Sequence, residues 1–309
     1  MSKENTAVTK KKIKRCKEDV VFDAACFIIL TLVLFVVAYP LYWVIISSIS
    51  APSAVSSGKV LLHPIGFTLK GYAEVFKNDQ VMRGFLNSLI ITFCGVMVNL
   101  IVTLPTSYAL SRSNFSGKKP ITIFYLITMF FGGGLIPTYL VIQRLQMLNT
   151  IWALILPGCL SVYNMIVART FFKSNISEEL YEAAEIDGCT QARFFFQIAL
   201  PLSKAIIAIL VLYYGVGHSN SYFSALVYIS DKAKYPLQLV LRNILITNQT
   251  ALSQTATTAA ARAALQEKQQ LIDVMKYSLI IISSIPVLVM YPLVQKHFVK
   301  GVMIGSMKG

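Results

Sequence analysis

The sequence predicts an all-α integral membrane protein with six transmembrane helices and both termini in the cytoplasm. Hydrophobic residues make up 55% of the 309 residues and charged residues only 14%, whereas a soluble domain carries about a quarter charged residues. Long apolar runs recur along the chain, and basic residues cluster at their ends. The low charge indicates lipid as the surrounding solvent, and the position of the basic residues indicates the topology.

Six apolar runs are long enough to cross a bilayer, which takes about 20 residues of helix. The predicted spans are residues 24–48, 84–111, 120–143, 148–168, 205–227 and 277–295. The first span is not expected to be a cleaved signal peptide. Its apolar region is too long, and it continues with interfacial aromatic residues where a cleavage site would lie.

Basic residues between the spans assign the two sides of the membrane, because cytoplasmic loops are enriched in lysine and arginine. The cluster at 10–17 places the N-terminus inside, and the short basic segments 112–119 and 169–204 are also inside. Residues 49–83, 144–147 and 228–276 are then outside. The predicted organisation is a basic cytoplasmic segment at 1–20, a transmembrane domain at 21–299 and a cytoplasmic tail at 300–309.

Proline and glycine interrupt most of the spans. The prolines are Pro40, Pro105, Pro137, Pro157, Pro286 and Pro292, and the third span also contains Gly132-Gly133-Gly134. Proline inside a membrane helix frees backbone groups that neighbouring helices or water must satisfy. The pattern indicates bent helices around a path that opens and closes, or else irregular packing, since both residue types are common in membrane helices.

Several functional classes find no support in the sequence. The net charge of +14 is explained by topology, so nucleic acid is not expected as a partner. A phosphate-binding GxxxxGK[ST] loop, an HExxH motif and a nucleophile elbow are all missing from the sequence. No metal site is expected, and the five cysteines are interpreted as packing thiols. His218 is the only titratable group well inside a span, whereas ion-driven transporters need intramembrane charges.

The acidic segment EELYEAAEIDG at 178–188 differs from the rest of the chain. Ser177 is a good N-cap, the acids of the first turn complement the helix dipole, and Gly188 is placed to end the helix. Leu180, Ala183 and Ala184 are predicted to share a narrow face of small residues that allows close approach. A helix on the lipid surface prefers a basic polar face. The acidic face therefore favours a protein partner over lipid.

This segment resembles the EAA motif of permease subunits of ABC importers. Glu182-Ala183-Ala184, three residues, Gly188, nine residues and Ile198-x-Leu200-Pro201 match that pattern, in a predicted cytoplasmic loop before the penultimate span. Four other stretches, NSLIITFCGVMVNLIVTLPTSYALSR, GGGLIPTYLVI, RTFFKSNISEELYEAAEIDG and FVKGVMIGSMKG, resemble the maltose-type subgroup, and most of all the permeases of oligosaccharide and polysaccharide-fragment importers. The resemblance covers residue 20 to the C-terminus and implies the type I ABC importer permease fold.

The resemblance implies coupling helices at 177–200 that dock on a separate ATPase subunit. The implied coupling residues are Glu178, Glu179, Glu182, Ala183, Ala184, Ile186, Asp187 and Gly188. The tail from Gly301 through Lys308 to Gly309 is implied to reach the ATPase interface, or else to be a frayed end. ATP and Mg are implied to bind the partner, so this chain needs no cofactor and has no catalytic residue.

The implied assembly has a second permease subunit, two ABC ATPase subunits and an external solute-binding protein in a bacterial plasma membrane. The resemblance implies a carbohydrate as substrate. Aromatic and hydrogen-bonding residues are the expected sugar contacts, and the candidates for the substrate path are Tyr139, Asn164, Tyr214, Asn220, Tyr222 and Phe223. Aromatic residues at membrane interfaces are often only belt residues. Ser219 replaces the tryptophan that often follows the histidine in similar permeases.

The external segment 228–276 contains the alanine- and glutamine-rich stretch TTAAARAALQEKQQLIDVMKY, which is expected to be helical. It is expected either to contact the binding protein or to be a solvated helix. Two rival functions are a stand-alone secondary transporter of a small polar solute and a membrane-embedded enzyme. The first needs intramembrane charges or internal repeats, and the second needs a catalytic constellation. Neither feature is found in the sequence.

Overall fold

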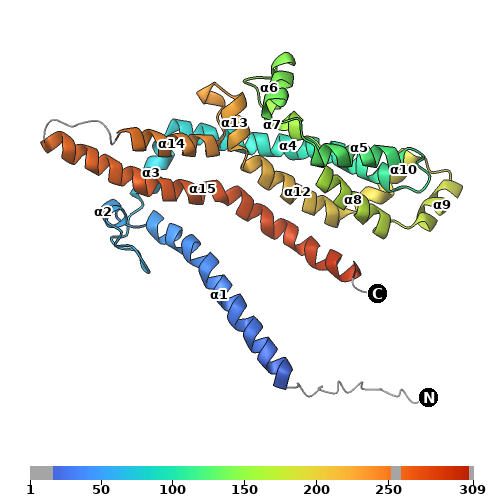
Figure 1. Cartoon of the computed structure of the whole chain (residues 1–309), viewed down its shortest axis with the longest axis horizontal. Helices are drawn as coiled ribbons and strands as arrows, with labels where there is room; N and C mark the ends of the chain where they lie inside the picture. The colour runs from blue at the N-terminus through green and yellow to red at the C-terminus, as the bar shows by residue number, and fades with distance from the viewer. Residues whose placement is uncertain (1–16, 252–258, 306–309) are drawn as a thin grey trace.

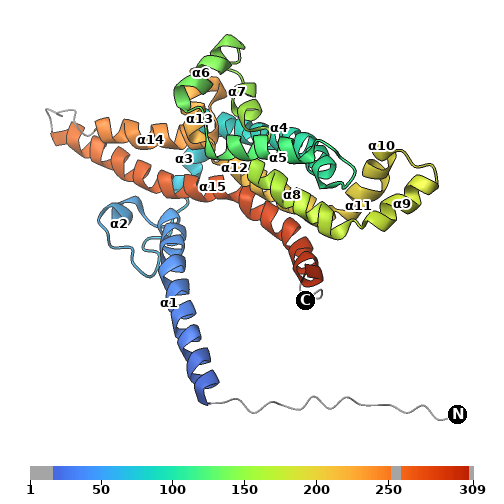
Figure 2. The same cartoon turned by 45° about the vertical axis from the view of Figure 1, so that its right-hand side comes forward.

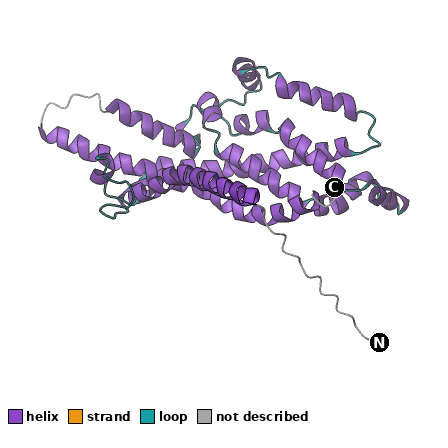
Figure 3. Cartoon of the chain, turned by 60° about the horizontal axis from the view of Figure 1, so that its bottom comes forward, coloured by secondary structure: helices purple, strands orange, loops and turns teal. Residues whose placement is uncertain are grey.

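The computed structural model describes residues 17–251 and 259–305, and those residues form helices joined by loops (Figure 3). The helices of the first half are α1 (Lys17–Ser48), α2 (Pro52–Ser56), α3 (Lys70–Lys77), α4 (Asp79–Ser111), α5 (Lys118–Phe130), α6 (Leu135–Arg144), α7 (Trp152–Ile155) and η1 (Leu156–Gly158). Those of the second half are α8 (Val162–Asn175), α9 (Glu178–Ile186), α10 (Gln191–Phe194), the π-helix η2 (Phe195–Ala199), α11 (Leu200–Leu202), α12 (Lys204–Ser219), α13 (Tyr222–Tyr228), η3 (Lys232–Lys234), α14 (Leu237–Ala251) and α15 (Ala259–Gly305).

Three described helices are long and apolar enough to cross a membrane by themselves, namely α1, α4 and the part of α15 from Gln269 to Pro292. Three more spans are obtained only if each of three bent helix pairs counts as one. The six predicted spans are therefore confirmed in number only under this condition. The first break contains Gly132-Gly133-Gly134, the second directly follows Pro157 and Gly158, and the third follows Pro201. Both residue types disfavour a continuous helix.

The predicted third span at 120–143 is not one helix. α5 and α6 meet at an angle of 113°, and the break lies at the three consecutive glycines, where Gly134 has φ +84°. L-residues rarely adopt this backbone conformation, so glycine permits the sharp turn. The predicted fourth span is also bent, by 52° between Trp152–Gly158 and α8. The expectation of bent helices is confirmed at these two places.

The predicted boundaries of the last two spans were wrong. α12 ends at Ser219 rather than continuing to residue 227, and α13 is a separate helix. The bent pair that includes α12 is instead Gln191–Leu202 with α12, at an angle of 80°. The sixth predicted span is the middle of α15, which is 47 residues long and also contains the described part of the alanine-rich stretch. Pro286 and Pro292 lie inside this continuous helix.

Helix α4 is the centre of the bundle, and it packs against α8, α12 and α14 (Figure 1). α12 packs in turn against α15, which also contacts α3 and the end of α1. Small residues permit these close approaches. A Cβ at Gly71 on α3 would overlap Ser278 and Val274 of α15, and one at Gly215 on α12 would overlap Met290. Close backbone approach at small residues is typical of membrane helix packing.

Helix α1 stands apart from the bundle along most of its length (Figures 1 and 2). Its only buried residues are Ile46, Ser47 and Ser48 at the C-terminal end. There Trp43 makes an edge contact to Tyr277 of α15, with ring centroids 5.1 Å apart. Most of the rest of this apolar helix is exposed, so in a membrane it faces lipid or another membrane helix.

Candidate coupling surface and substrate pocket

The acidic segment folds as a short helix with defined ends. The Ser177 hydroxyl accepts a hydrogen bond from the Leu180 amide at 3.3 Å, which confirms the predicted N-cap. Gly188 has φ +74°. Its amide donates to the Glu185 carbonyl, and the Cys189 amide donates to the Ala184 carbonyl. These two bonds form a Schellman motif, so the predicted role of Gly188 in ending the helix is confirmed.

The exposed face of α9 differs from the predicted one. Ala184 is buried together with Tyr181, whereas Leu180 and Ala183 are exposed. Adjacent helical residues are about 100° apart, and here the edge of the buried face falls between Ala183 and Ala184. The prediction that Leu180, Ala183 and Ala184 share one contact face was therefore wrong. The outward face instead presents Leu180 and Ala183, with the side chain of Ile186 at the tip 87% exposed.

The implied coupling residues fall into two groups. Those that are exposed are Glu179, Glu182, Ala183, Ile186, Asp187 and Gly188. Glu178 is instead held by an ion pair to Arg112, with 3.1 Å between Oε1 and Nη2, and Ala184 packs inward. An acidic rim around small and apolar side chains is thus free to meet a partner, while the opposite face holds the helix to the bundle.

Aromatic packing holds α9 against the bundle. Tyr181 makes an edge contact to Phe194 of α10, with centroids 5.3 Å apart. Phe195 is buried against Tyr108 of α4, 5.0 Å between centroids, whereas Phe196 is exposed. Thr190 caps α10 by accepting from the Arg193 amide. The segment after Gly188 is therefore the anchor of α9, and α9 itself is the protruding part.

The implied tail contact is only partly within the described residues. Gly301 lies in the last turns of α15, which ends at Gly305. Lys308 and Gly309 lie outside the described residues. The last turn of α15 lies at the same end of the bundle as α9 and α10 (Figure 1).

A pocket of about 490 Å³ lies between the α7–α8 and α12–α13 segments. Asn164, Tyr214, Asn220 and Phe223 of the predicted substrate path line this pocket. The other two predicted residues do not. Tyr139 stacks on Tyr228 with centroids 6.3 Å apart, and Tyr222 is 45% exposed beside Phe223. The structure thus brings four of the six together, with two amides, a hydroxyl and an aromatic surface of the kind that sugars contact.

Hydrogen bonds from α4 fix the inner wall of the pocket. His218 Nε2 lies 2.7 Å from Asn99 Oδ1, and Asn99 Nδ2 donates to the Gly158 carbonyl at 2.7 Å. The Tyr214 hydroxyl is 2.7 Å from the Thr103 hydroxyl. Asn99 and Thr103 are fully buried, so these bonds satisfy groups that would otherwise be unpaired in a membrane interior.

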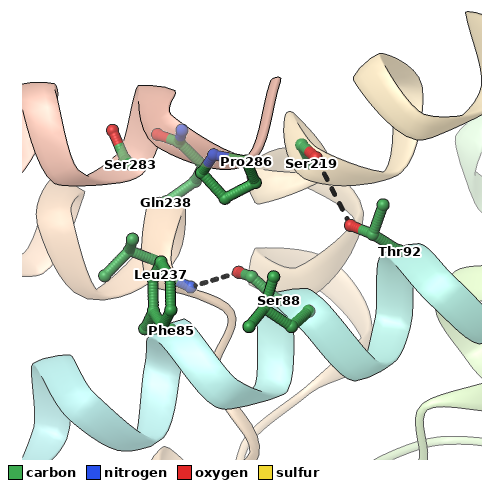
Figure 4. A pocket seen from close by; sticks show the side chains of 9 residues that line it. Phe85, Ser88, Thr92, Ser219, Leu237, Gln238, Ser283 and Pro286 are labelled. Carbon is green, nitrogen blue, oxygen red and sulfur yellow. Dashed lines mark hydrogen bonds between the residues drawn. The ribbon is translucent and has the colours of Figure 1, made fainter. Parts of the chain in front are cut away.

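Ser219 lies in a separate crevice, bounded by α4, α12, α14 and α15 (Figure 4). Its hydroxyl is 3.3 Å from that of Thr92, and Ser88 accepts a hydrogen bond from the Leu237 amide at 2.8 Å. The cavity measures about 20 Å³, which is enough for one water molecule. The departure from the usual tryptophan therefore lies outside the larger pocket.

A bundle of apolar helices with a polar pocket and a protruding acidic helix defines a subunit of a membrane transporter. No family model matches the chain. The polygalacturonan/rhamnogalacturonan transport system permease protein YtcP of Bacillus subtilis is 35% identical to it, over 93% of this chain and 98% of that one. The probable ABC transporter permease protein YurM of Bacillus subtilis is 30% identical to it, over 93% of this chain and 89% of that one.

The fold is also shared with a solved transporter. A chain in the crystal structure of a bacterial ABC transporter involved in the import of the acidic polysaccharide alginate has a TM-score of 0.81 and 27% identity. The match covers 93% of this chain and 100% of that one. The chain belongs to the family of ABC transport-system permeases.

Proposed function

We propose that this chain is half of the membrane pore of an importer that takes up an oligosaccharide. In this assembly a second permease subunit completes the pore, and an external solute-binding protein delivers the sugar in a bacterial plasma membrane. Two of the similar proteins support a saccharide, because YtcP is a polygalacturonan/rhamnogalacturonan transport permease and the solved transporter is involved in alginate import. The pocket at Asn164, Tyr214, Asn220 and Phe223 offers matching chemistry.

The observation that carries the proposal is the outward face of α9. Leu180, Ala183 and Ile186 are exposed apolar or small residues surrounded by Glu182 and Asp187. A water-exposed surface of this kind fits a protein cleft with basic groups at its rim. The proposed cleft belongs to the ABC ATPase subunits, two of which bind and hydrolyse the ATP. This chain then supplies the pathway and no catalytic residue.

The test uses the complex purified from native membranes through an affinity tag on this chain. We expect ATPase subunits to co-purify, and ATP hydrolysis to rise when the sugar-loaded binding protein is added. The variant Glu182→Lys places a cation on the acidic face, and we expect it to lose co-purification of the ATPase. Glu18→Lys, a charge reversal on the exposed first turn of α1, is the matched control.

Two results would contradict this function. ATP hydrolysis by this chain purified alone would assign it the catalytic step. Sugar uptake by this chain alone in proteoliposomes, driven by an ion gradient, would support the rival secondary transporter. The relatives favour the permease over that rival.

A further inference from the structure

Arg112 forms the C-cap of α4 and, together with Ser113, makes a polar link to α9. Its guanidinium pairs with the Glu178 carboxylate, and the Ser113 hydroxyl donates to the same carboxylate oxygen. The guanidinium carbon also lies 3.8 Å from the centroid of the Tyr181 ring. Arg112 therefore pairs with Glu178 in the first turn of α9, and its guanidinium lies over the ring of Tyr181 on the buried face of α9.

The environment of Arg112 makes this link stronger than an ordinary surface ion pair. Its side chain is only 11% exposed, while that of Glu178 is 40% exposed, so the arginine charge is screened less by water and salt than that of a fully exposed side chain. Its guanidinium also lies about 6 Å from the Tyr108 and Phe194 rings. Arginine stacks on aromatic rings and pairs with carboxylates at the same time, which lysine does not do equally well. The backbone at 112–113 is fixed as well, because Lys118 Nζ donates to both carbonyls.

The other end of this connection is the pocket. α4 is one helix of 33 residues that ends at Ser111, immediately before Arg112. Within it, Asn99 and Thr103 hold His218 and Tyr214 of the pocket wall. α4 thus holds the pocket wall by hydrogen bonds. At its C-terminal end, Arg112 connects it to α9, the proposed contact helix for the ATPase.

We infer that Arg112 is a positioning residue that couples movement of α9 to α4, and through α4 to the pocket. The inference rests on the proposed function. When the ATPase subunits move α9, the ion pair and the ring contact make α4 move with it. Without them, α9 can follow the ATPase while the pocket stays in place. ATP hydrolysis would then continue with less sugar transported.

The alternative is that Arg112 only stabilises the folded loop, and the ratio of sugar transported to ATP hydrolysed separates the two roles. We expect Arg112→Gln to assemble with its partners and to hydrolyse ATP, with sugar uptake per ATP reduced about 5-fold or more, a usual size for coupling between sites. Arg112→Lys keeps the charge and is expected to restore part of this ratio. Lys119→Gln removes an exposed charge from the first turn of α5, next to the same loop, and is the matched control.

A double-variant comparison tests the ring contact. Tyr181→Phe keeps the ring and is expected to resemble the parent, whereas Tyr181→Leu is expected to reduce uptake per ATP. If both residues act in one link, adding Tyr181→Leu to Arg112→Gln reduces the ratio little further. Should Arg112→Gln fail to assemble, Arg112→Lys and Tyr181→Leu are compared in its place.

Three outcomes would overturn the inference. The first is a parental ratio of sugar uptake to ATP hydrolysis in Arg112→Gln. The second is that Arg112→Gln and Tyr181→Leu lower this ratio independently in the double variant. The third applies if Arg112→Gln does not assemble, and it is a parental ratio in both Arg112→Lys and Tyr181→Leu. A lower melting temperature of Arg112→Gln with an unchanged ratio of uptake to ATP hydrolysis also overturns the inference, because it indicates a purely structural role. If the parental complex shows no ATP-dependent sugar uptake, the proposed function fails first and this inference fails with it.

Discussion

The imidazole of His218 lies against the backbone of Gly95 and 2.7 Å from the side-chain oxygen of Asn99, so α12 is fixed to α4 in the middle of the bundle. Asn99 is fully buried and also holds the Gly158 carbonyl. One amide therefore connects three segments that are far apart in the sequence. The shape of the pocket wall depends on this connection.

Asn99→Ala removes both of these hydrogen bonds. We expect it to reduce the stability of the protein by about 0.5–2 kcal/mol, the range for interhelical hydrogen bonds in membranes. The measurement is the thermal unfolding midpoint in detergent. Thr106→Ala is the control, because the Thr106 hydroxyl donates only to the Val102 carbonyl of its own helix. Equal midpoints for the two variants would show that the network does not stabilise the bundle.

Gly95→Ala tests the close approach directly. A Cβ at this position would overlap the His218 ring, and we expect overpacking to cost about 1–3 kcal/mol. His218→Ala removes the ring, so the double variant is expected to be more stable than the sum of the single effects predicts. Gly132→Ala is the control, since nothing lies within 4 Å of a Cβ there. If the losses of stability in Gly95→Ala and His218→Ala simply add in the double variant, the close contact between Gly95 and His218 is contradicted.

Local features of α9 could be predicted from the sequence because they depend on neighbouring residues. The Ser177 cap and the Gly188 terminus each follow from the conformational preference of one residue. The break near Gly134 also has a local cause, although its angle of 113° does not follow from the sequence. The orientation of α9 could not be predicted, because burial of Ala184 is decided by the aromatic residues of other helices.

The contacts that build the pocket and the link to α9 are not local. His218 and Asn99 are separated by 119 residues, and Arg112 and Glu178 by 66. A single sequence does not say which helices pack together, so Arg112, Asn99 and Thr103 were missed as site residues. One signal for Arg112 is its position directly after a long apolar run, which was interpreted only as topology.

Gly188 tests the geometry of the proposed ATPase contact. Its φ of +74° lies in the left-handed region, which costs other L-residues roughly 1–2 kcal/mol. A Cβ would meet nothing within 4 Å, so any effect comes from the backbone. We expect Gly188→Val to fray the end of α9 and weaken co-purification of the ATPase, and Gly188→Asn to retain more binding because asparagine tolerates this conformation. Equal binding by Gly188→Val and the parent would rule out a need for the Schellman motif.

The topology is tested by labelling introduced cysteines with an impermeant reagent, in a variant whose native cysteines are replaced. α2 and the α14 end of the bundle lie opposite α9 and α10 (Figure 1). The exposed residues Lys59, after α2, and Lys119, at the start of α5, are therefore expected on opposite sides of the membrane. We expect Lys59→Cys to react on intact cells. Lys119→Cys should react only after permeabilisation, since its loop is basic and basic loops stay in the cytoplasm.

The same experiment applies to the two ends of the chain. Ser2 and Ser306 lie outside the described residues, and the basic segments beside them predict that both are cytoplasmic. Cysteines at these positions should react only after permeabilisation, as at Lys119. Reaction of either terminus on intact cells would require an odd number of crossings or an inverted chain. Both contradict six spans with α9 facing an ATPase in the cytoplasm, whereas protection of both ends and of Lys119 leaves α9 on the side where ATP is available.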